Sequence, residues 1–84
     1  AKRGEYFSGR LQELPGIASV RGRGLLLAAE LADGRDAKAA YAALLERGLV
    51  TNAVTATSLR FAPPLTVTET ELDEAISIIG DVLQ

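Results

Sequence analysis

With 84 residues and a formal net charge of −2, the chain forms one small domain at most and lacks the basic surface that nucleic-acid phosphates require. The absence of cysteine and histidine excludes disulfides, thiol nucleophiles, imidazole metal ligands and the usual general base. No stretch approaches the roughly 18 apolar residues of a membrane span and no signal peptide opens the chain, so we expect no membrane partner and a cytoplasmic location.

The first part of the chain is predicted to form a helix followed by an extended segment. Residues 2–14 carry apolar side chains at helical spacing, and Pro15-Gly16 ends the pattern. Residues 17–31 favour an extended conformation, in which Gly22 and Gly24 mark a bend, a bulge or a close backbone approach. A phosphate-cradling loop is not indicated there, because Gly24 leads into an apolar, strand-like run instead of a helix.

A second helix and two short strands are predicted next. Asp36 is a suitable N-cap for a helix that reaches about residue 47, and Gly48 stands where a left-handed residue is expected. Residues 49–54 and 58–62 favour strands, and the three residues between them suit a hairpin connection.

The last helix begins with a capping-box pattern at Thr68-x-x-Glu71. Its predicted apolar side consists of Leu72, Ala75, Ile76, Ile79 and Leu83. The order of elements predicts an α+β fold over residues 1–84, with a small three-stranded, mostly antiparallel sheet and three helices packed on one face.

Arg60 is the candidate functional residue. In the predicted strand Leu59 and Phe61 share one face, so Arg60 points to the other, away from the helices. It is the only base between Gly48 and the end of the chain, where the acids are Glu69, Glu71, Asp73, Glu74 and Asp81. An arginine that loses water needs a partner, which is either one of these acids or an anion from outside the chain.

Two interpretations of Arg60 stay open on the pattern alone. Its guanidinium can grip a carboxylate through two charge-assisted hydrogen bonds, or it can be a solvated strand residue with a weak surface ion pair. Arg21 and Arg23 suit an exposed strand edge that resists aggregation. Asn52 favours a cross-strand hydrogen bond over a ligand contact.

The remaining polar residues indicate no catalytic, cofactor or metal site. Lys2 lies at a chain end and Lys38 on the polar side of a helix, so neither occupies a dry pocket that would activate an amine. The acids from Glu69 to Glu74 suit the electrostatics of a helix start better than metal binding. By its residues alone, the chain can hold an anionic group but has no residue placed to perform catalysis.

Three stretches of the sequence resemble the C-terminal end of a class III aminotransferase, the acetylornithine aminotransferases in particular. They are residues 20–31, residues 44–54 and the run Leu-Arg-Phe-Ala-Pro-Pro-Leu at 59–65, which is followed by Thr68-x-x-Glu71-Leu-Asp. The last of these is the specific part, and the resemblance covers about residues 3–83.

The resemblance implies the small C-terminal domain of a fold-type I enzyme that uses pyridoxal phosphate and forms a homodimer. It implies that Arg60 binds the α-carboxylate of the amino-acid or 2-oxo-acid substrate. The Schiff-base lysine and the cofactor site would belong to a preceding large domain of the same chain. The start at Ala1 and the lack of methionine also lead us to expect a piece of a longer protein.

Two other hypotheses remain beside this one. The chain can be a free-standing α+β module that binds an amino acid or dimerises through the uncovered face of its sheet, without catalysis. It can also be an isolated folding unit with no activity of its own.

Overall fold

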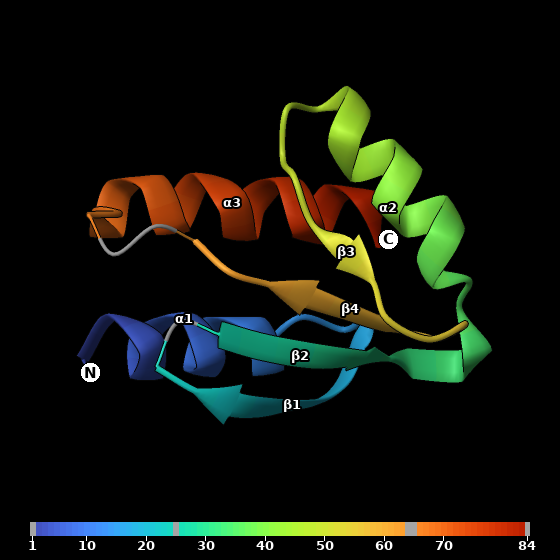
Figure 1. The fold of residues 1–84 in the computed structure, drawn as a ribbon, viewed down its shortest axis with the longest axis horizontal. Helices are drawn as coiled ribbons and strands as arrows, with labels where there is room; N and C mark the ends of the chain where they lie inside the picture. The colour runs from blue at the N-terminus through green and yellow to red at the C-terminus, as the bar shows by residue number, and fades with distance from the viewer. Residues whose placement is uncertain (1, 25, 64–65, 84) are drawn as a thin grey trace.

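The described residues of the chain fold into three α-helices and one four-stranded antiparallel sheet (Figure 1). A computed structural model describes residues 2–24, 26–63 and 66–83. The elements in chain order are α1 (Lys2–Gln12), β1 (Ile17–Arg23), β2 (Leu26–Leu31), a 3-10 turn (Ala32–Gly34), α2 (Ala37–Glu46), β3 (Asn52–Ala53), β4 (Ser58–Phe61) and α3 (Glu69–Val82). The strand order across the sheet is β1-β2-β4-β3, and the predicted α+β class is confirmed.

The predicted number of three strands is wrong, because residues 17–31 form a hairpin and not one extended segment. β1 and β2 pair antiparallel along most of their length, down to Arg23 opposite Leu26. Gly22 and Gly24 have φ angles of 137° and 54°, which side chains disfavour. A Cβ atom at position 22 would lie 2.1 Å from the backbone oxygen of Leu26. Of the alternatives expected at these glycines, a close backbone approach is found at Gly22.

The two strands predicted between the last helices are shorter than expected. In β3 only Asn52 and Ala53 pair with β4, and β4 ends at Phe61 instead of Ala62. Pro63 follows, and its missing N–H cannot extend the ladder. Residues 64 and 65, part of the specific run in the sequence, lie outside the described residues.

The helix boundaries follow the local signals in the sequence. The Asp36 side chain accepts a hydrogen bond from the backbone N–H of Lys38 at 3.0 Å, and Gly48 adopts a φ of 84° after α2. The Thr68 hydroxyl accepts from the backbone N–H of Glu71, whose carboxylate accepts from the backbone N–H of Thr68. The predicted N-cap and capping box are confirmed.

One hydrophobic core joins the helices to a single face of the sheet. All three helices contribute to it, and the sheet adds the inner side chains of β2 and β4, namely Leu27, Ala29, Leu31, Leu59 and Phe61. The Phe7 ring of α1 meets Phe61 edge to face, with 5.9 Å between the ring centroids. α1 and α3 run alongside one another in Figure 1, and they are in contact. The predicted apolar side of α3 is buried except for Ala75, which is half-buried.

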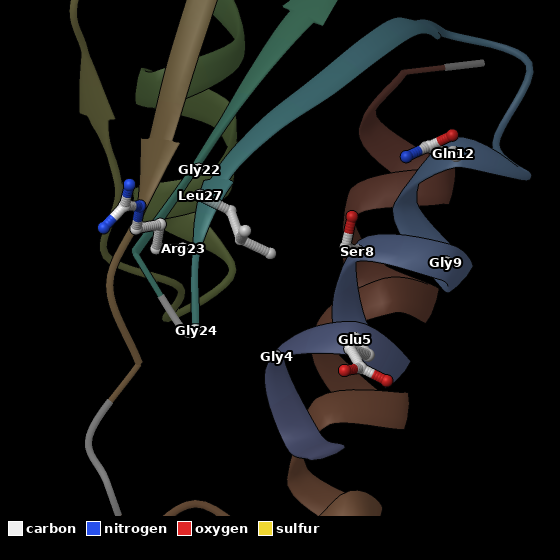
Figure 2. A pocket seen from close by; sticks show the side chains of 9 residues that line it. All are labelled: Gly4, Glu5, Ser8, Gly9, Gln12, Gly22, Arg23, Gly24 and Leu27. Atoms are coloured by element: carbon white, nitrogen blue, oxygen red, sulfur yellow. The ribbon is translucent and has the colours of Figure 1, made fainter. Parts of the chain in front are cut away.

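The other face of the sheet, called the outer face below, carries most of the polar strand residues. The register places on it Ser19, Arg21, Arg23, Leu26, Ala28, Glu30, Asn52, Ser58 and Arg60. Figure 2 shows the two directions at one end of the sheet, where Leu27 points toward α1 and Arg23 points away from it. The arginines and Asn52 on the outer face are exposed.

Candidate functional site

Arg60 lies in the middle of β4 and projects from the outer face. Its neighbours Leu59 and Phe61 are 0% and 3% exposed, whereas Arg60 is exposed. The predicted direction of the side chain, away from the helices, is therefore confirmed. Because the side chains on either side are buried, the strand backbone at Arg60 is held in place.

The acids of α3 do not neutralise Arg60. Asp73 accepts a hydrogen bond from Arg10 at 2.9 Å, and Asp81 lies 3.3 Å from Arg47. The carboxylate of Glu71 belongs to the capping box of its own helix. Within residues 2–24, 26–63 and 66–83, Arg60 makes neither a hydrogen bond nor an ion pair. Its guanidinium is thus available to an anion from outside this part of the chain.

A row of side chains crosses the outer face at the level of Arg60. Arg21 on β1 pairs with Ala28 on β2, Ala28 pairs with Arg60, and Arg60 pairs with Asn52 on β3. The small side chain of Ala28 separates the two arginines. Asn52 therefore lies directly beside Arg60. The cross-strand hydrogen bond expected from its side chain is absent among the described residues.

Arg60 and Asn52 both line a hollow of about 250 Å³. The other lining residues are Val50, Thr51 and Ala62, so the described wall of the hollow holds one positive charge and no negative charge. Val50 is 76% exposed and offers an apolar surface next to the arginine. The charge and the open side suit a small anion with an aliphatic part.

A second hollow, of about 460 Å³, lies between α1 and the β1–β2 hairpin (Figure 2) and is less suited to an anion. Arg23 is part of its lining, but its side chain points away from α1. The carboxylate of Glu5 lines the same hollow and would repel a negative ligand. The hollow at Arg60 is therefore the better candidate for the carboxylate site.

Glu30 on the outer face has a local role that the sequence pattern did not reveal. Its two carboxylate oxygens accept hydrogen bonds from the hydroxyls of Ser58 and Thr57, each at 2.5 Å. These bonds, first that from Ser58 and then that from Thr57, hold the pKa of Glu30 below its usual value of 4.5, and the charge of Arg21 acts in the same direction. Glu30 thereby ties β2 to the start of β4, the strand that carries Arg60. Only the strand register, which joins residues far apart in sequence, brings these groups together.

We expect Glu30→Gln to lower the stability of the fold at neutral pH and to leave it nearly unchanged in acid. Because the folded-state pKa is depressed, the ionised carboxylate stabilises the fold above pH about 4.5, and this contribution is lost as the pH falls through the folded-state pKa. Urea unfolding of the chain between pH 7 and pH 3 measures the difference from the wild type. The exposed Glu74→Gln variant is the control, and an equal pH profile for both variants would contradict the role of Glu30.

The described residues do not fit a site for pyridoxal phosphate, the cofactor that the resemblance implies. That cofactor requires a lysine amine and a cradle for its phosphate. Lys38 is exposed in the first turn of α2, and the side chain of Lys2 lies outside the description. The glycine-rich segment at Gly22 and Gly24 ends a strand and enters a second strand, not a helix.

No group of three or more acidic side chains is arranged to hold a metal ion in the described ranges. None of the helices described is long and apolar enough to cross a membrane.

The sequence matches proteins that transfer amino groups. The profile of the family described as "Aminotransferase class-III" matches residues 1–83. An acetylornithine aminotransferase of Caldanaerobacter subterraneus is 43% identical over 86 residues, covering 98% of this chain and 22% of the relative. An ornithine aminotransferase of Staphylococcus carnosus is 43% identical over 81 residues, covering 94% of this chain and 20% of the relative.

Solved structures agree with these matches. A lysine aminotransferase from M. tuberculosis superimposes with a TM-score of 0.86 and 34% identity, over 98% of this chain and 20% of that protein. An acetylornithine aminotransferase from Elizabethkingia anophelis gives a TM-score of 0.81 and 31% identity, over 98% of this chain and 23% of that protein. The chain thus spans about a fifth of the length of the relatives that it matches.

Proposed function

Because the chain belongs to the class-III aminotransferase family, we propose that it is the small C-terminal domain of an acetylornithine aminotransferase. The parent enzyme would move an amino group between N-acetylornithine and 2-oxoglutarate in arginine biosynthesis. The names of several relatives support this substrate, although the similar relatives also include ornithine aminotransferases. The short span of the chain within those relatives supports the assignment to one domain of a larger enzyme.

Within that enzyme Arg60 binds the carboxylate of the amino acid or of the 2-oxo acid. The observation that carries this proposal is the exposed guanidinium on the outer face. It has no partner among the residues that the structure describes, and it lies in a hollow whose described wall has no negative charge. A planar fork of N–H donors matches a carboxylate through two parallel hydrogen bonds, which fix the orientation of the ligand as well as its position. The alternative of a weak surface ion pair finds no partner in the described part of the chain.

The contribution of this domain is one of positioning. A carboxylate held at two points leaves the rest of the substrate little freedom to rotate, so its amino-bearing carbon is presented in one orientation. β4 holds Arg60 in position, because its inner side chains Leu59 and Phe61 are buried in the core. We assign no catalytic residue to the described part of the chain.

The remaining parts of the active site are proposed to lie elsewhere in the enzyme. Pyridoxal phosphate, which the family implies, would be held by a large domain of the same polypeptide, since the residues described here do not fit it. We propose a homodimer in the cytoplasm, in line with the family resemblance and with a sequence free of cysteine.

An assay of the complete enzyme with a panel of amino donors tests the proposed substrate. With 2-oxoglutarate as the acceptor, we expect kcat/KM for N-acetylornithine to exceed the values for ornithine and 4-aminobutyrate by at least about tenfold, or about 1.4 kcal/mol. Formation of L-glutamate measures the reaction. A higher value for ornithine would make ornithine the preferred amino donor in place of N-acetylornithine. No transfer from any donor would contradict the proposed aminotransferase activity.

A further inference from the structure

The hollow at Arg60 contains a second polar group, the side-chain amide of Asn52, whose role the family assignment leaves open. We propose that Asn52 is a second donor to the carboxylate bound by Arg60, and that Val50 and Ala62 contact the aliphatic chain next to that carboxylate. The inference rests on the proposed function of Arg60 and specifies its ligand as an aliphatic carboxylate. It makes Asn52 a substrate-binding residue.

The strand register places the two donors together. Asn52 and Arg60 are direct partners in the antiparallel pair of β3 and β4. Side chains at such positions leave the same face with their Cβ atoms about 4.5–5.5 Å apart. Both side chains line the hollow of about 250 Å³ and both are exposed, so an anion can reach them from the same side.

The number of donors matches what a carboxylate accepts. Its two oxygens offer about four lone-pair sites, and a bidentate guanidinium occupies about two of them. The amide NH₂ of Asn52 can donate to a remaining site. The Asn52 amide is not engaged elsewhere, since its side chain has no hydrogen-bond partner in the part of the chain that the structure describes.

The rest of the hollow favours an aliphatic ligand. Val50 is 76% exposed and lines the hollow beside Arg60, so its side chain is accessible to the hydrocarbon part of a ligand there. Val50 and Ala62 also line an adjoining, mostly apolar cavity of about 370 Å³, whose lining includes Leu49, Pro63 and Leu72 and the charged Glu71. A carboxylate with a short hydrocarbon chain therefore fits the arrangement better than an inorganic anion does.

The test measures the dissociation constant of pentanoate from the complete enzyme, as a competitor of the amino donor. We expect Asn52→Ala to weaken the binding of pentanoate by about tenfold, since a hydrogen bond to a charged group is lost. We expect Asn52→Asp to weaken it further, although the side chain keeps its shape, because its charge repels the carboxylate and pairs with Arg60. Gln12→Ala is the matched control, which removes an exposed amide from α1 and should change nothing.

The outcomes separate this inference from the proposed function. One outcome is that Arg60→Ala strongly weakens the binding of pentanoate, whereas both Asn52 variants bind it with a dissociation constant within twofold of the wild type. In that case Asn52 is not a donor, and only the inference fails. If Arg60→Ala itself leaves the binding unchanged, the proposed function fails too. A purely structural role of Asn52 is excluded by a loss in Asn52→Asp that exceeds the loss in Asn52→Ala at equal thermal stability.

A comparison of carboxylates of different chain length tests the proposed contact of Val50 with the ligand. Pentanoate should bind severalfold more tightly than acetate to the wild-type enzyme, because its additional methylene groups lose contact with water against Val50. Val50→Ser should reduce this preference while acetate binding stays the same. An unchanged preference would remove Val50 from the site.

Discussion

Replacing Arg60 by lysine is expected to raise the KM of the complete enzyme for L-glutamate by about 30-fold, although the positive charge is kept. An ammonium group offers a point charge where the guanidinium offers a planar fork, so at least one of two charge-assisted hydrogen bonds is lost. Such a bond contributes about 1.5–3 kcal/mol, and a loss of about 2 kcal/mol corresponds to this factor. Arg60→Ala, which removes both bonds, should raise KM further.

Steady-state kinetics of the complete enzyme measure this effect, and the cofactor absorbance should stay the same in the variants. Arg23→Lys is the matched control, because Arg23 is also exposed on the outer face but does not line the hollow at Arg60. Its KM should equal that of the wild type. An unchanged KM in Arg60→Lys and Arg60→Ala would remove Arg60 from the substrate site.

Phe61→Ala is expected to destabilise the chain by about 3–5 kcal/mol, whereas Arg60→Ala should change the stability by no more than about 0.5 kcal/mol. Phe61 is 3% exposed and meets Phe7 edge to face, so its truncation leaves a cavity between the sheet and α1. A small domain has a total stability of about 5–15 kcal/mol, so Phe61→Ala would remove a large fraction of it.

Urea unfolding of the chain measures both variants under one set of conditions. The contrast between adjacent residues tests which face of β4 is buried, because both changes truncate a large side chain to the same methyl group. Equal losses for the two variants, or a larger loss for Arg60→Ala, would contradict the orientation on which the site depends.

The sequence predicted the features that depend on neighbouring residues. The N-cap at Asp36, the left-handed Gly48 and the capping box of Thr68 and Glu71 are each specified within a few residues, and the structure contains all of them. The direction of Arg60 follows from the alternation of a strand between two large apolar side chains, which needs no knowledge of distant partners.

The features that were missed depend on pairing across the chain. The β1–β2 hairpin was predicted as one segment, because the residues after Gly24 are apolar and lack the polar turn signals of an ordinary hairpin. The bond of Glu30 to Ser58 requires the register of β2 with β4, across 28 positions. The pair of Arg10 and Asp73 likewise joins α1 to α3, and the sequence pattern does not show which acid meets which base.

The separation of the sheet into two faces leaves Arg60 exposed although its strand is packed in the core. The inner face buries Leu59 and Phe61, which hold β4 in place, and the outer face presents Arg60 and Asn52 in register. Glu71, Asp73 and Asp81 on α3 and Glu30 on β2 each have a partner other than Arg60. The anion that Arg60 requires is therefore expected from a substrate.

A crystal structure of the complete enzyme with bound L-glutamate tests the central claim most directly. We expect two guanidinium nitrogens of Arg60 to lie about 2.7–2.9 Å from the two oxygens of one substrate carboxylate. A substrate whose carboxylates are both held by other cations, with Arg60 left in solvent, would contradict the account.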